Sequence, residues 1–272
     1  MRCSPANTEH PSWYPAPAKC NRLAANNAYR SRGTRSLQRI AQVRRASCYR
    51  ATAMTSPAST ELTILYEQGP CLVVLKPAGV LTQAPPGIDS MEVRIRRFLQ
   101  QREGKQHNLY LGVPHRLYRS VSGALVVARH VRAARRLAEQ FEQRTIDKRY
   151  WCLVEGQVEA ERGTWVDFMR KVADQPRSEI VAESEPDARE AILHFEVKSR
   201  RDRYTWLEIQ LETGRTHQIR LQASHHGHPI LGDAMYGSRC SFGPASEDPR
   251  EHWIALHARY LDRKSTRLNS SH

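Results

Sequence analysis

Residues 114–123 form the segment PHRLYRSVSG, which concentrates polar side chains directly before an apolar run. Its hydrogen-bond donors include His115, Arg116, Arg119, Ser120 and Ser122. Loops held by a rigid framework commonly carry binding and catalytic groups, and this loop leads into the strand-like run GALVVA. The simpler alternative is a polar turn before a strand. The central residue, Tyr118, offers a phenol, and a phenol is mostly protonated at neutral pH because its ordinary pKa is near 10.

Two further segments contain side chains suited to recognising a base and an anion. The segment KRYWCLVEG contains Tyr150, whose ring could act as a stacking platform for a base that has left its stack. The segment GRTHQIR contains Arg215, His217 and Arg220. A guanidinium can hold a carboxylate through two parallel hydrogen bonds and keep it ionised. Considered alone, Tyr150 is explained by core packing and Arg220 by a solvated helix position.

The sequence lacks the patterns that hold nucleotides and metals. No GxGxxG or P-loop spacing occurs, so we expect no nucleotide cofactor. The run HHGH at His225, His226 and His228 lacks the second ligand pair of a metal site, and the six cysteines form no CxxC pair. We therefore expect neither a cofactor nor a metal. No run of eighteen apolar residues occurs, which predicts no transmembrane helix.

Strand-like and helix-like segments alternate along the chain and predict an α+β fold. Residues 62–79 contain two apolar runs split by a Gly-Pro turn, as in a β-hairpin. Residues 89–102 predict a helix capped by Asp89 or Ser90, and residues 131–144 space apolar residues at helical intervals. Further strands are expected at 123–130, 148–158, 191–200 and 204–213, and a helix within 214–227. Since two of these strands alternate apolar and polar residues, we expect a mixed, largely antiparallel sheet with packed helices.

The net charge of +14 is concentrated at the ends of the chain. Residues 1–53 contain ten Lys and Arg against one acid, Glu9, and residues 262–272 contain three against one. Removing both segments leaves +3 for residues 54–261. A strongly basic protein is a candidate for nucleic-acid binding, but a central region this mildly basic requires that RNA binding be argued from motifs.

We divide the chain into three parts. Residues 1–53 lack sustained apolar periodicity and are expected to be disordered. Three origins fit them: a basic arm, a mitochondrial transit peptide, or a spurious extension upstream of a start at Met54. Residues 54–261 are the expected folded domain. Residues 262–272, DRKSTRLNSSH, resemble the translation of a sequencing-library adapter, so we expect a non-native tail that truncates the domain at about Leu261. The alternative is a genuine polar tail.

Five segments of residues 61–261 follow the order of motifs in the RluA-type RNA pseudouridine synthases. ILYEQGPCLVVLKPAGVLT resembles the family's opening hairpin, with its Lys-Pro-Ala/Ser-Gly turn. HRLYRSVSGALVVA resembles the catalytic loop His-Arg-Leu-Asp-x-x-x-Ser-Gly. KRYWCLVEG resembles the Lys-x-Tyr strand, and IALHARYL the Leu-His-Ala strand. LETGRTHQIRLQASHHGHPILGDAMYG resembles the Thr-Gly-Arg-x-His-Gln-Ile/Leu-Arg segment, which is the most specific of the five.

The resemblance implies a uridine isomerase that acts on ribosomal or transfer RNA without a metal or cofactor. Such enzymes break the C1′–N1 bond of uridine, turn the base and rejoin it through C5. The family's loop Asp attacks C1′ or abstracts the 2′ proton of the sugar, and a carboxylate suits both roles. The motif match places Tyr118 at the position of this Asp, Tyr150 at the base-stacking tyrosine and Arg220 at the arginine that pairs with the Asp. It also implies an RNA-binding groove lined by Arg116, Arg119, Arg215 and Arg220, with His217 as a further RNA contact.

Tyr118 departs from the family pattern at the reactive position. A phenol is larger than a carboxylate and neutral at pH 7, so we expect Arg220 to lose its partner and the chain as written to have little or no synthase activity. Asp and Tyr codons differ by one base, so one origin is a sequence error. The other is a pseudoenzyme that binds and remodels RNA on the same fold. An unrelated basic structural protein, with motifs that match by coincidence, is the third hypothesis.

The same reasoning sets expectations for partners and place. We expect RNA as the partner, no membrane association and a monomer. We expect a cytoplasmic location, or an organelle if residues 1–53 are a genuine transit peptide.

Overall fold

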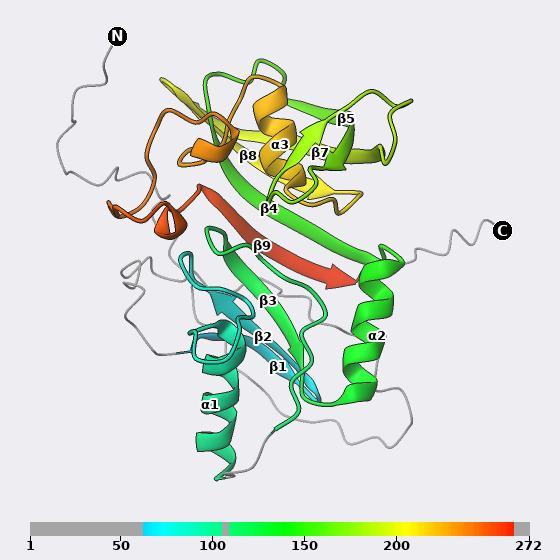
Figure 1. Cartoon of the computed structure of the whole chain (residues 1–272), viewed down its shortest axis with the longest axis vertical. Coiled ribbons are helices and arrows are strands. Elements are labelled where there is room, and N and C mark those ends of the chain that lie inside the picture. The colour runs from blue at the N-terminus through cyan, green and yellow to red at the C-terminus, as the bar shows by residue number, and fades with distance from the viewer. Residues whose placement is uncertain (1–61, 105–108, 264–272) are drawn as a thin grey trace, which may run out of the picture.

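The structure is a computed structural model that describes residues 62–104 and 109–263 (Figure 1). The expectations for residues 1–53 and for most of the C-terminal tail therefore fall outside the described residues. Two residues of the expected tail, Asp262 and Arg263, continue the last strand.

The described residues form one nine-stranded sheet with the order β1-β2-β3-β9-β4-β8-β7-β5-β6. All neighbouring strands are antiparallel except β3 and β9, which are parallel. The expected α+β fold with a mixed, largely antiparallel sheet is therefore confirmed. In chain order the strands are β1 Ile64–Gln68, β2 Cys71–Lys76, β3 Ser122–Ala128, β4 Ile146–Glu155, β5 Arg162–Lys171, β6 Ser178–Ile180, β7 Arg189–Arg201, β8 Tyr204–Leu211 and β9 Leu256–Arg263.

The helices are those that the sequence predicts. They are α1 Met91–Glu103, α2 Val131–Glu142 and α3 Gln218–His225, with 3₁₀ turns η1 Ala234–Tyr236 and η2 Pro249–Glu251. Of the two caps expected for α1, Ser90 is the one used: its hydroxyl accepts a hydrogen bond from the backbone N–H of Val93 at 3.4 Å. Helix α1 buries Ile95 and Leu99, four residues apart, so one stripe of the helix faces the sheet.

The helices cover the sheet in two halves (Figure 1). Helices α1 and α2 pack on opposite faces of the β2–β3 region: α1 contacts the side of Leu125, and α2 contacts the side of Val126. Helix α3 lies over β5, β6 and the core of the second half, which includes Leu207 and Ile209. Strand β9 runs between the two halves, and the loop that carries Tyr118 lies beside it.

The sequence analysis missed β5 and β6. In β5, Trp165, Asp167 and Met169 are buried while Val166 is 51% exposed, so a charged residue interrupts the apolar face. The burial of Asp167 depends on partners far away in sequence, because its carboxylate accepts a hydrogen bond from Gln222 of α3 at 2.7 Å.

Candidate active site

The loop that precedes β3 is held by backbone contacts on both sides. The hydroxyl of Thr82 donates to the carbonyl of Leu117 at 2.8 Å and accepts from the N–H of Leu117 at 3.1 Å. The N–H of Gly79 donates to the carbonyl of Arg119 at 2.7 Å. These bonds clamp the turn after β2 against residues 117–119, so the position of Tyr118 is fixed by its neighbours.

Lys76 is a functional candidate that the sequence analysis did not single out. Its side chain is fully buried at the end of β2, and its ammonium donates to the carbonyls of Pro77, Arg119 and Val121 at 2.9, 3.3 and 2.7 Å. Burial, with a smaller contribution from the charge of Arg119, lowers the pKa of Lys76 to about 7. The sequence analysis noted the Lys-Pro-Ala-Gly turn that contains Lys76 but assigned the lysine no role. Its place as a buried cation bound to the candidate catalytic loop required the structure.

Gly123 allows the loop to join the sheet. It has φ +128, and a Cβ at this position would overlap the backbone of Ala258 in β9. Gly123 and Ala258 are register partners in the parallel β3–β9 pair. Only glycine combines this backbone conformation with such a close approach.

Tyr118 lies at the surface of the site. Its side chain is 43% exposed, and its ring meets the ring of His217 edge-on, with centroids 4.2 Å apart. Its phenol makes no hydrogen bond to any residue that the structure describes. The structure thus brings the candidate catalytic loop against the GRTHQIR segment, 99 residues along the chain, as the motif match implies.

Arg220 has a partner, and the expectation that it lacks one is wrong. Its guanidinium donates to the two carboxylate oxygens of Asp233 at 2.6 and 2.7 Å, and both side chains are buried. Asp233 lies in the GHPILGD stretch, which the motif match included but to which no role was assigned. Arg220 is only 7% exposed, so it lies beneath the surface of the site. It therefore does not line an open RNA groove.

His217 connects this ion pair to a second phenol. Its Nε2 lies 3.0 Å from an Arg220 nitrogen that can only donate, so Nε2 accepts and the proton lies on Nδ1. Nδ1 then donates to the hydroxyl of Tyr236 at 2.8 Å. Burial and the positive charge of Arg220 lower the pKa of His217 to about 3, so the imidazole is neutral at physiological pH. His217 has φ +57 and is buried, which makes it a support of the site and not an exposed RNA contact.

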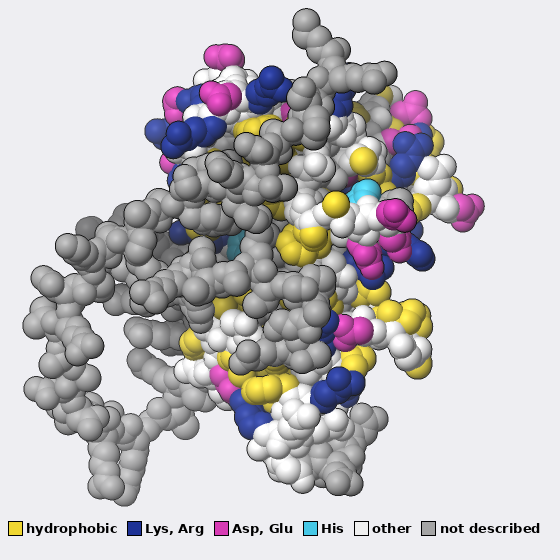
Figure 2. All heavy atoms as spheres, turned by 90° about the vertical axis from the view of Figure 1, so that its left-hand side faces the viewer, with side chains coloured by type: hydrophobic (Ala, Val, Ile, Leu, Met, Phe, Trp, Pro, Cys, Tyr) yellow, Lys and Arg dark blue, Asp and Glu magenta, His cyan; other side chains and the backbone are white. Residues whose placement is uncertain are grey.

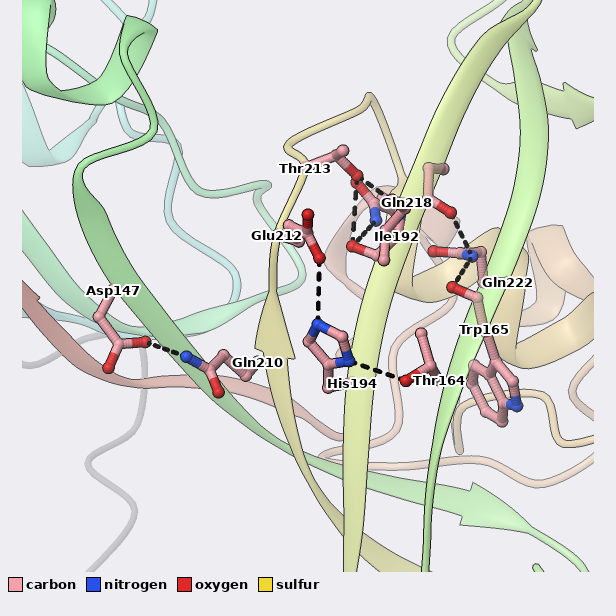
Figure 3. A network of polar contacts seen from close by, with 11 residues as sticks. Asp147, Thr164, Trp165, Ile192, His194, Gln210, Glu212, Thr213, Gln218 and Gln222 are labelled. Atoms are coloured by element: carbon pink, nitrogen blue, oxygen red, sulfur yellow. Dashed lines mark hydrogen bonds and ion pairs between the residues drawn. The ribbon is translucent and has the colours of Figure 1, made fainter. Parts of the chain in front are cut away.

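Gln218 fixes the turn that presents His217 (Figure 3). Its side-chain oxygen accepts from the hydroxyl of Thr213 at 2.8 Å and from the N–H of Arg215 at 2.9 Å. Its side-chain nitrogen donates to the carbonyl of Ile192 in β7 at 3.0 Å. One amide therefore closes the turn onto itself and onto the neighbouring strand, which explains why a glutamine follows the histidine here.

Tyr150 lies in β4, two strands from the candidate catalytic loop. It pairs with Ala258 of β9, which in turn pairs with Gly123. The ring is half-buried against the central core, and burial raises the pKa of its phenol to about 12. This is compatible with an aromatic platform whose hydroxyl stays protonated.

The remaining predicted RNA contacts are divided between exposed and anchored positions. Arg116 is exposed. Arg119 is half-buried, and its Nε donates to the carbonyl of Gly79 at 2.9 Å. Arg215 is half-buried, and its Nε donates to the carbonyl of Glu190 at 2.8 Å. The loop thus places Arg116 and Arg119 beside Tyr118, whereas Arg215 is directed toward the start of β7.

On the face seen in Figure 2, acidic and basic side chains lie next to one another along the rim, in keeping with a mildly basic folded region. Within residues 62–104 and 109–263, no three His, Cys, Asp or Glu side chains come together to hold a metal ion. No helix in these ranges is long and apolar enough to cross a membrane.

The sequence model for the family "RNA pseudouridylate synthase" matches residues 70–225. The chain therefore belongs to the RNA pseudouridylate synthase family.

Curated relatives agree with this assignment. An uncharacterized RNA pseudouridine synthase from Synechocystis is 34% identical over 74% of this chain and 60% of its own length. Ribosomal large subunit pseudouridine synthase D from Xanthomonas campestris is 33% identical over 71% of this chain and 57% of its own length. The chain thus spans less than two thirds of the length of these relatives.

Solved structures share the fold. The human protein titled RNA Pseudouridylate Synthase Domain Containing 1 is 26% identical, with a TM-score of 0.58 over 76% of this chain and 80% of that one. The human protein titled RNA Pseudouridylate Synthase Domain Containing 4 is 22% identical, with a TM-score of 0.60 over 73% of this chain and 83% of that one.

Proposed function

We propose that this protein binds ribosomal or transfer RNA and positions a flipped uridine for isomerisation to pseudouridine, and that Tyr118 leaves the chain as written with little or no activity. The observation that carries the proposal is the place of Tyr118. It lies in the clamped loop, against His217 and above the buried Arg220–Asp233 pair. Tyr118 supplies no carboxylate at the position where the resemblance places the nucleophile or base of the reaction.

The residues around Tyr118 favour an RNA-binding role that does not depend on catalysis. Arg116 and Arg119 flank Tyr118, and Tyr150 offers a ring on a neighbouring strand. Arg220 is neutralised by Asp233, so it does not require a carboxylate at position 118 as its counterion. This observation also favours the second candidate function, a non-catalytic protein that binds and remodels RNA on the same fold. A cytoplasmic location and a monomeric state stay predictions.

The test compares Tyr118→Asp with the chain as written and with Tyr118→Asn. Pseudouridine formation moves the glycosidic bond to C5 of uridine and releases the hydrogen held there. Loss of tritium from C5-labelled RNA therefore reports the reaction. We expect release with Tyr118→Asp alone, because Tyr118→Asn matches the size of Asp without its charge.

Each outcome has a clear meaning. Release by the chain as written, at a rate comparable with Tyr118→Asp, would overturn the claim of inactivity. RNA binding by all three proteins without release by any would favour the non-catalytic role. Absence of RNA binding by all three would contradict both candidate functions.

A further inference from the structure

A cluster of basic side chains lies beside the candidate active site, at the end of the sheet where β4 and β7 begin. Its members come from separate segments: Arg144 follows α2, Lys148 lies in β4, Arg189 begins β7 and Arg215 lies in the GRTHQIR turn. We call these four residues the basic patch.

Backbone geometry brings three of the members, Lys148, Arg189 and Arg215, together. The Nε of Arg215 donates to the carbonyl of Glu190, the residue after Arg189, at 2.8 Å. The ammonium of Lys148 lies 3.1 Å from where a Cβ on Gly214 would be, directly beside Arg215. Strands β4, β8 and β7 are neighbours in the sheet, which fixes these segments side by side.

The charges of Arg144 and Arg189 lie close enough to act on Arg215. Burial lowers the pKa of Arg215, and the charges of Arg144 and Arg189 lower it further, against a smaller opposing effect of Glu190. Lys148 likewise contributes to the lowered pKa of His115. Arg144 and Arg189 are exposed and make no ion pair with any other residue in the described ranges. Two exposed arginines without ion pairs, held near the charge of Arg215, favour an anionic partner.

Two acidic residues near the basic patch are hydrogen-bonded to residues outside it. Figure 3 shows Asp147 bonded to Gln210 and Glu212 bonded to His194, at 3.1 and 3.2 Å. Side chains alternate between faces along a strand, so Asp147 and Lys148 lie on opposite faces of β4. Glu190 is an acidic neighbour of Arg215 within the patch.

Arg144 adds an independent observation. It follows the C-cap of α2 with φ +55, a left-handed conformation that helix ends usually assign to glycine. An arginine here accepts backbone strain of about 1 kcal/mol. A side-chain function at this position would account for that cost.

We infer that the basic patch binds backbone phosphates of the RNA next to the nucleotide held in the active site. Two segments carry both a site residue and a patch residue, two positions apart: Tyr150 with Lys148, and His217 with Arg215. Lys148 and Tyr150 lie on one strand, where two residues span about 7 Å, so this side of the patch lies next to the site. This inference rests on the proposed function, since it assigns the path by which the substrate strand passes the site.

The test measures the affinity of a labelled RNA hairpin with uridines in its loop as a function of salt concentration. The triple variant Arg144→Gln, Lys148→Gln, Arg189→Gln removes three charges. The control Arg162→Gln, Arg201→Gln, Arg203→Gln removes three exposed charges at the opposite ends of β5 and β7–β8. Each phosphate contact contributes about 0.7 to the slope of log affinity against log salt for a single strand. We expect the patch variant to lose about 2 from the slope and on the order of tenfold in affinity at about 0.1 M salt.

The outcomes separate the patch from the proposed function. An unchanged slope in the patch variant, or an equal fall in the control variant, would overturn the inference. Binding to vesicles of phosphatidylserine and phosphatidylcholine that is lost in the patch variant, with RNA affinity unchanged, would also overturn it and assign the patch to a membrane. Absence of RNA binding by the unmodified chain would instead contradict the proposed function. Circular dichroism of each variant checks that it is folded.

Discussion

The guanidinium of Arg220 binds the carboxylate of Asp233 through two hydrogen bonds in the interior of the protein, beneath the ring of His217. An arginine so placed cannot be free to hold a carboxylate at position 118 unless it shares its donors. Its remaining nitrogen donates to His217, which meets Tyr118 edge-on. Arg220 therefore acts on position 118 through His217 in this chain. The ion pair beneath the site is therefore complete without a carboxylate at position 118.

Removing the charge of Asp233 should strongly destabilise the protein. Asp233→Asn leaves the buried guanidinium of Arg220 without its counterion, so we expect a loss of about 3–5 kcal/mol in the free energy of unfolding. Urea denaturation monitored by tryptophan fluorescence measures it. Glu179→Gln, which breaks the partly exposed Arg170–Glu179 pair, should change stability little. Equal effects of the two substitutions would show that the Arg220–Asp233 pair is not a principal support.

Substitution of Gly123 should separate the candidate catalytic loop from the sheet. In Gly123→Ala, the new methyl group would overlap the backbone of Ala258, so β3 and β9 must move apart. Gly69→Ala is the matched control, because Gly69 also has positive φ, at +52, but has no atom within 4 Å of the added Cβ. We expect the control to cost about 1 kcal/mol and Gly123→Ala several times more. Similar melting temperatures for the two variants would contradict this account of Gly123.

Local patterns predicted most elements of this fold but not the partners of its buried charges. The β1–β2 hairpin, α1, α2 and the cap at Ser90 follow from spacing and capping chemistry that neighbouring residues supply. Strand β5 was missed because the burial of Asp167 depends on Gln222, which is distant in sequence. The same limit applies to Asp233 and Arg220: both lie in recognised motifs, yet their pairing depends on how the segment after α3 folds back. The role of Lys76 likewise becomes visible only when the loop closes over it.

Lys76 should make stability rise with pH between 7 and 9. Its pKa is about 7 in the folded protein against 10.5 for an ordinary lysine, so the unfolded chain binds more protons in this range. Raising the pH therefore favours the folded state, by at most about 1.4 kcal/mol per pH unit. Lys76→Met should remove this slope, whereas Lys171→Met, at an exposed strand end, should retain it. Urea denaturation at pH 7, 8 and 9 measures the slopes. An unchanged slope in Lys76→Met would show that another group titrates in this range.

His217 should make the protein less stable in acid. Its folded pKa of about 3 lies below the ordinary value of 6.5, so between pH 6.5 and 3 the unfolded chain binds a proton that the folded protein excludes. The free energy of unfolding should fall as the pH falls through this window, by up to about 1.4 kcal/mol per pH unit from this residue. His217→Asn is the informative variant, because asparagine tolerates the left-handed backbone at φ +57 and removes the titrating ring. Its stability should depend less steeply on pH between 6.5 and 4.5. Nitrogen chemical shifts of the His217 ring at pH 5 give a second measure: a neutral ring protonated at Nδ1 is expected, and a doubly protonated ring would contradict the hydrogen-bond chain from Asp233 to Tyr236.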